Sequence, residues 1–88
     1  MAMIISLPPV NTDLEAVGRR LRAIREARGL GLQQLADEIR LSQAELSMAE
    51  HGRRRLDSAQ LHALTTALHV SPRIVFETTI DISRIRPL

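Results

Sequence analysis

The sequence contains no cysteine and no lysine, and it has no long hydrophobic run. Without cysteine, a disulfide framework and thiolate metal sites are excluded, and a reducing cytoplasm is a suitable location. No segment approaches the roughly 18 apolar residues that a membrane-spanning helix requires. Residues 1–10 lack the basic start and the apolar length of a signal peptide. We therefore expect one small cytoplasmic domain from these 88 residues.

The absence of lysine means that all twelve basic residues are arginine, and their distribution is uneven. Residues 19–55 hold nine arginines and five acidic residues, a net charge of +4, whereas the rest of the chain carries −2. This asymmetry is compatible with a polyanionic partner. A solvated arginine-rich surface explains it as well, and charge alone favours that second explanation.

The sequence also lacks the motifs of common enzymes. It has no glycine-rich phosphate loop, no serine-elbow motif and no paired carboxylates that a chain of this size could enclose. The three histidines, His51, His62 and His69, follow no metal-binding spacing with the acidic residues. We expect no enzymatic activity, no metal and no cofactor.

Capping signals predict five helices in series. Five residues are positioned as N-caps: Thr12, Gly31, Ser42, Asp57 and Ser71. Thr12, Ser42 and Asp57 have side chains that can cap, and each precedes a Glu or Gln by three residues, which is the capping-box pattern. Gly29 and Gly52 are expected to end the first and third helices, and the short fifth helix runs through Phe76. The predicted fold class is therefore all-α.

The two ends of the chain differ from this helical pattern. Residues 78–83 alternate with a period of two, as strands do, and residues 3–5 form a second candidate strand. The predicted organisation is an N-terminal arm (1–11), a helical domain (12–77) and a C-terminal tail (78–88).

The second and third helices are separated by only three residues, which allows the third helix to project from the domain. Such a helix can enter the DNA major groove with its N-terminal residues leading. These residues are Gln43, Ala44, Ser47 and Met48. The Gln43 amide suits an adenine edge, while Ala44 and Met48 offer only apolar contact, for example to a thymine methyl. The alternative is that Gln43 is simply an exposed polar residue, and Glu45 is expected to act as a capping residue.

Residues 18–76 resemble the Cro/C1-type helix-turn-helix domain, or XRE family. The matching segments are GRRLRAIREARGL, QQLADEI, LSQAELS, AEHGRRR and ALHVSPRIVF. The resemblance implies a five-helix, lambda-repressor-like fold with base contacts from Gln43, Ala44, Ser47 and Met48. It further implies phosphate contacts near Gln33 and near Arg53, Arg54 and Arg55. Arg25 and Glu50 occupy the positions of a partly buried ion pair.

Three positions depart from the family pattern: Leu32, Arg40 and Met48. Arg40 replaces the glycine of the turn, where a positive φ would cost about 1 kcal/mol, and it offers a phosphate contact in return. Met48 stands where polar base readers are common. Leu32 stands where a polar phosphate contact is frequent, a role that Gln33 is expected to take.

The resemblance implies a bacterial or phage transcription regulator that binds a palindromic operator as a homodimer. Ile80 and Ile82 on the tail strand are the first choice for the dimer contact, either across a two-fold axis or with residues 3–5. The rival dimer surface is the face of the fifth helix at 74–76. The other alternative is that the tail folds back on its own domain and makes no dimer contact. An antitoxin-type interaction module is the alternative function. Expected partners are double-stranded DNA, a second copy, and RNA polymerase or a toxin, but no membrane.

Overall fold

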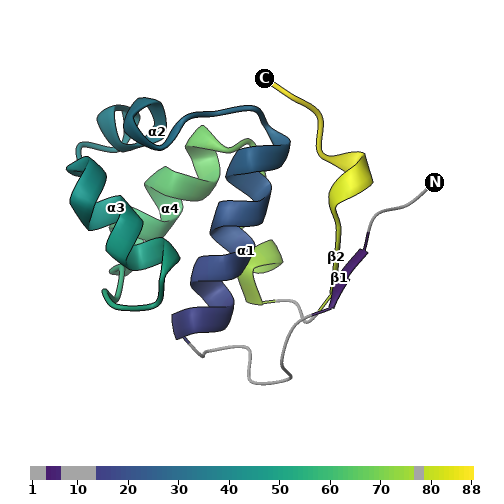
Figure 1. The fold of residues 1–88 in the computed structure, drawn as a ribbon, viewed down its shortest axis with the longest axis horizontal. Helices are drawn as coiled ribbons and strands as arrows, with labels where there is room; N and C mark the ends of the chain where they lie inside the picture. Colours follow the sequence, from purple (N-terminus) through teal and green to yellow (C-terminus); the bar gives the residue numbers. More distant parts are fainter. Residues whose placement is uncertain (1–3, 7–13, 77–78) are drawn as a thin grey trace.

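The computed structural model describes residues 4–6, 14–76 and 79–88 (Figure 1). In chain order its elements are β1 (Ile4–Ser6), α1 (Leu14–Ala27), α2 (Leu32–Glu38), α3 (Gln43–Glu50), α4 (Ser58–Ala67), η1 (Pro72–Phe76), β2 (Thr79–Asp81) and η2 (Ile82–Arg84). The all-α class is confirmed. One detail was wrong, because the fifth helix η1 is a 3-10 helix, as is common for a segment of only five residues.

The predicted N-caps open the described helices. The Ser42 hydroxyl accepts from the backbone N–H of Glu45 at 3.0 Å, and the Asp57 carboxylate accepts from that of Gln60 at 2.7 Å. Gly31 caps α2 with its backbone only, donating to the Gln34 side chain at 3.4 Å. Thr12 lies outside the described residues. The starts of α2, α3 and α4 are therefore fixed by bonds that span three residues.

The α-helices of the described residues, α1 to α4, end in the same way, with one residue in the left-handed conformation: Gly29, Arg40, Gly52 and His69. At the end of α2 the N–H of Leu41 bonds the carbonyl of Ala36 at 3.0 Å, and that of Arg40 bonds Asp37 at 3.4 Å. This pair of backbone hydrogen bonds is the Schellman motif. The two glycine ends were predicted, whereas His69 was not.

The core is made almost entirely of aliphatic side chains. Its largest fully buried aliphatic members are Leu21, Ile24, Leu35, Leu46, Leu64, Leu68 and Val75. Arg20 is also fully buried, and its guanidinium donates to the carbonyl of Val75 at 2.8 Å. This bond joins α1 to η1 across 55 residues of sequence, so an arginine that looked like surface charge is part of the core.

Helix α1 crosses the C-terminal end of α3 at very short range. A Cβ atom at Gly18 would overlap the backbone oxygens of Ala49 and Glu50. Only glycine fits here, because backbone atoms of two packed helices leave no space for a side chain. This contact fixes the position of α3 relative to the rest of the domain.

The terminal strands β1 and β2 pair with each other in antiparallel fashion, Ile5 opposite Ile80. In Figure 1 they lie on the side of α1 away from α3. The predicted tail strand was too long, since β2 ends at Asp81 and Ile82 begins η2. Ile82 and Ile85 are half-buried and pack against the core of their own chain. The tail therefore covers part of its own domain.

Candidate nucleic-acid interface

The turn between α2 and α3 keeps the shape of a glycine turn although it carries arginine. Arg40 has φ of +59° and is exposed. Both Schellman hydrogen bonds of the turn form. The turn, which sets the direction of α3, therefore has the same backbone geometry with arginine as it would have with glycine. Arg40 lies three residues before Gln43, the first residue of α3.

The first turn of α3 is held by a reciprocal capping box. The backbone N–H of Ser42 donates to the Glu45 carboxylate at 3.0 Å. Hydrogen bonds from Ser42 hold the pKa of the Glu45 carboxyl below its ordinary value, and the nearby Arg54 guanidinium lowers this pKa further. Glu45 thus acts as a cap.

The outer face of α3 presents the residues that the sequence predicted. Gln43 and Ala44 are exposed, Ser47 is half-buried, and Met48 is 41% exposed. On the opposite face Leu46 and Ala49 are buried. The exposed face therefore combines one amide, one hydroxyl and two apolar side chains, a set suited to a mixed polar and methyl-bearing surface.

The three consecutive arginines after α3 are not equivalent. Arg53 and Arg55 are exposed, whereas Arg54 is half-buried and pairs with Glu45 at 3.0 Å. This ion pair ties the loop back to the start of α3. Two of the three guanidinium groups are thus available to an approaching anion, and the third is partly neutralised.

Gln33 lies exposed in the first turn of α2, and its amide nitrogen donates to Asp37 at 2.7 Å. Because the two residues are four apart, the bond lies along the surface of the helix. The Gln33 nitrogen would have to release Asp37 before it could donate to a phosphate.

The Arg25–Glu50 ion pair is present and almost enclosed. Arg25 Nε donates to the Glu50 carboxylate at 2.7 Å, and Arg25 Nη2 donates to it at 3.1 Å. The Arg25 side chain is 12% exposed and the Glu50 side chain is 3% exposed. A third bond runs from Arg25 Nη1 to the carbonyl of Leu30 at 2.9 Å. The hydrogen bond to Glu50 raises the pKa of Arg25 above its ordinary value. The pair locks α1 to the end of α3.

Two further arginines of the basic region serve the fold, and sequence reasoning missed both. Arg20 lies one turn from Val17 and Ile24 on the apolar stripe of α1, a local signal that was available. Arg28 donates to the carbonyls of Leu68, His69 and Arg86 at 2.8, 2.9 and 3.0 Å. No local pattern predicts those contacts, because the acceptors are at least 40 residues away.

Residues 16–74, more than half of the chain, match the family described as a helix-turn-helix domain. The chain belongs to this family, and its Cro/C1-type, lambda-repressor-like fold is that of a family of DNA-binding transcription regulators. A comparison with curated proteins gave no match.

Solved structures of three regulators are similar to this chain. The restriction-modification controller protein C.AhdI from Aeromonas hydrophila is 35% identical, with a TM-score of 0.69 over 72% of this chain and 96% of that one. The clp gene regulator ClgR from Corynebacterium glutamicum is 38% identical, with a TM-score of 0.67 over 69% and 79%. The P22 c2 repressor, solved with a synthetic operator, is 27% identical, with a TM-score of 0.64 over 67% and 89%.

No helix in the described part of the chain is long and apolar enough to cross a membrane.

Proposed function

We propose that this protein is a sequence-specific transcription regulator that binds double-stranded DNA as a homodimer on a palindromic operator. The observation that carries the proposal is the outer face of α3, which is exposed, with the exposed Arg40 shortly before the helix in the chain and the exposed Arg53 and Arg55 shortly after it. A projecting helix flanked by cations fits the major groove with phosphates on either side. The similarity of this chain to the P22 c2 repressor, which was solved with a synthetic operator, also supports DNA binding.

In this proposal Gln43, Ala44, Ser47 and Met48 face the base edges. The Gln43 amide pairs with adenine, and Met48 packs against a thymine methyl. Glu45 does not read bases, since its carboxylate is held by Ser42 and Arg54. The proposed half-site is therefore rich in A·T pairs.

Phosphate contacts are assigned to Gln33, Arg40, Arg53, Arg54 and Arg55. Arg40, Arg53 and Arg55 have exposed guanidinium groups, whereas Arg54 must first exchange its pairing with Glu45. Each phosphate neutralised by a cation contributes about 0.9 to the slope of log K against log salt. Two or three such contacts per subunit give a strongly salt-dependent affinity.

The dimer contact is assigned to the edge of the two-stranded sheet. Among the described residues, each of its strands has one neighbour in the sheet, so one backbone edge is left for a strand of the second copy. Ile82 is half-buried against its own core, which leaves backbone pairing as the main attraction. Val75, on the rival helix-five surface, is fully buried and offers no contact to a partner.

The test is selection of bound duplexes from a random DNA pool at near-physiological salt. We expect enrichment of a palindrome with half-sites about one helical turn apart. Binding without enrichment would refute sequence-specific readout, and no binding would refute the function.

A matched pair of variants separates base reading from phosphate contact. Gln43→Ala should weaken binding to the selected operator about 10-fold or more while leaving random DNA unaffected. Gln33→Ala makes the same chemical change on α2 and should weaken binding to the selected operator and to random DNA to the same small extent. Equal losses on both DNAs from Gln43→Ala would contradict its assignment to a base edge.

A further inference from the structure

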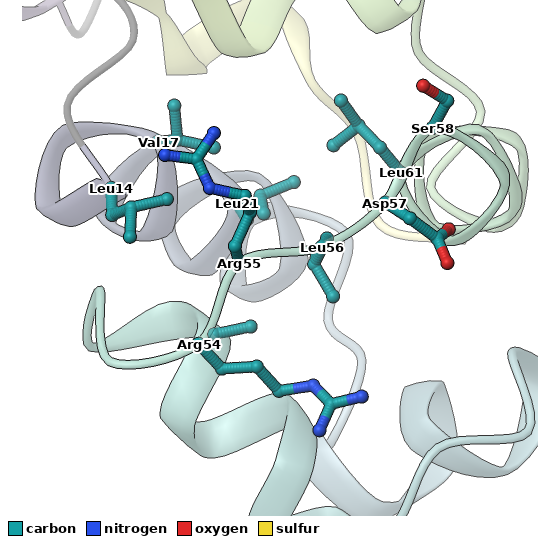
Figure 2. A pocket seen from close by; sticks show the side chains of 10 residues that line it. Leu14, Val17, Leu21, Arg54, Arg55, Leu56, Asp57, Ser58 and Leu61 are labelled. Atoms are coloured by element: carbon teal, nitrogen blue, oxygen red, sulfur yellow. The ribbon is translucent and has the colours of Figure 1, made fainter.

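A pocket of about 220 Å³ lies between α1, the end of α3, the loop after it and the start of α4 (Figure 2). Its lining is mainly aliphatic, with four polar residues at the rim. The lining residues are Leu14, Val17, Leu21, Ala49, Arg54, Arg55, Leu56, Asp57, Ser58 and Leu61. It lies apart from the face of α3 assigned to DNA bases.

The aliphatic walls of this pocket are incompletely covered. Leu14, Val17, Leu56 and Leu61 are all half-buried, over a floor formed by the buried Leu21. Since each half-buried side chain leaves apolar surface in water, an apolar occupant would gain free energy by covering all four.

The volume limits the size of that occupant. A dry, aliphatic cavity of about 150 Å³ is large enough to hold benzene. The present pocket, at about 220 Å³, therefore accommodates a six-membered ring with one short substituent.

The charge at the rim selects the substituent. Arg55 makes no hydrogen bond or ion pair with the described residues, and in Figure 2 its side chain extends toward α1. Arg54 extends away toward α3, where it pairs with Glu45, and Asp57 is engaged as the cap of α4. The one available charge is thus a cation, which favours a carboxylate.

We propose that this pocket binds a small aromatic carboxylate, with the ring between α1 and α4 and the carboxylate on Arg55. Arg55 is itself one of the arginines assigned to phosphate, so a carboxylate bound to Arg55 would compete with that contact. Occupancy then weakens DNA binding, and DNA weakens occupancy by the same factor. Only this coupling rests on the proposed function; the ligand site stands without it.

The first test is titration of the DNA-free protein with benzoate, followed through the methyl resonances of Val17, Leu56 and Leu61. We expect saturable shifts confined to the pocket, and binding at least 10-fold weaker for the neutral isostere benzamide. Arg55→Gln should reduce benzoate affinity by a similar factor, whereas Arg53→Gln, on a neighbouring exposed arginine outside the pocket, should not. Equal effects of the two arginine variants, or no methyl shifts, would overturn the site.

A second variant tests the cavity itself. Val17→Phe places a ring in the pocket and should abolish benzoate binding while the amide spectrum remains that of a folded domain. If this variant does not fold, the Arg55→Gln and Arg53→Gln comparison decides alone. To test the coupling, the affinity for the selected operator is measured with and without saturating benzoate. Benzoate should weaken the operator affinity of the wild type several-fold and leave the operator affinity of Val17→Phe unchanged. Benzoate binding without that change would refute only the coupling, while absence of DNA binding would refute the proposed function and leave the site intact.

Discussion

The Arg25–Glu50 pair shows how one buried charge depends on its partner. Arg25→Met would leave the Glu50 carboxylate, 3% exposed, without its counter-ion. We expect a loss of about 3 kcal/mol in the free energy of unfolding, measured by urea denaturation. A double variant that also replaces Glu50 by Leu should recover most of this loss, because no buried charge remains.

The control for this prediction is Arg22→Met, which removes an ion pair of similar length. Arg22 and Glu26 meet at 2.8 Å but are both about half exposed. Water screens such a pair, so its removal should cost no more than about 0.5 kcal/mol. A cost at Arg25 as small as that at Arg22 would contradict the structural role of the buried pair.

Arg40 combines a strained backbone with an exposed charge. Arg40→Gly should relieve the left-handed strain and raise the free energy of unfolding by about 0.5 kcal/mol, the gain being limited by the greater freedom of glycine in the unfolded chain. If Arg40 contacts a phosphate, the variant should also lower the salt slope of DNA binding by about 0.9.

His69→Gly is the matched control, because His69 occupies the same left-handed position at the end of α4, with φ of +57°. It should give a similar gain in stability with no change in DNA binding. A salt slope that is unchanged in Arg40→Gly would remove Arg40 from the phosphate contacts.

At the scale of the element, the start of α3 should respond to acid. The pKa of Glu45 is lowered in the folded protein, so its contribution to stability is full above the ordinary glutamate pKa, about 4.3. It is lost as the pH falls through the lower, folded value. The difference in stability between wild type and Glu45→Gln should therefore be larger at pH 7 than at pH 3, as measured by urea denaturation.

Glu38→Gln serves as the control for this titration. Glu38 is exposed at the end of α2 and makes no hydrogen bond or ion pair with the described residues. Its substitution should leave the pH profile close to that of wild type. A Glu45→Gln profile parallel to wild type at all pH values would mean that the capping bonds do not form in solution.

For the whole molecule, the C-terminal tail has two separable roles. It packs on the domain through Ile82 and Ile85, and it is tied to α1 where the N–H of Leu88 donates to the carbonyl of Arg28 at 2.8 Å. A chain ending at Glu77 should lose about 2 kcal/mol of stability, since two half-buried isoleucines are removed. If β2 is the dimer contact, the truncated chain should also sediment as a monomer.

The double variant Ile82→Ala/Ile85→Ala distinguishes the two roles of the tail. It removes the packing of η2 and its neighbour but keeps the backbone of β2, so we expect lower stability with the dimer retained. A truncated chain that still sediments as a dimer would move the contact elsewhere, with the half-buried Ile74 on η1 as the next place to test.

Sequence by itself determined the local features of this protein. The caps at Ser42 and Asp57 and the glycine ends at Gly29 and Gly52 were predicted because each depends on hydrogen bonds that span at most five residues. The exposed face of α3 followed from the same caps, since they fix the phase of the helix.

Only the tertiary structure decided which charges are available and which apolar residues are covered. Arg28 and Arg54 look like Arg53 in sequence, yet each is engaged by a partner in another element. Ile82, likewise, packs against the core of its own chain instead of facing a partner. These outcomes depend on contacts between segments far apart in the chain, which packing creates and no local pattern encodes.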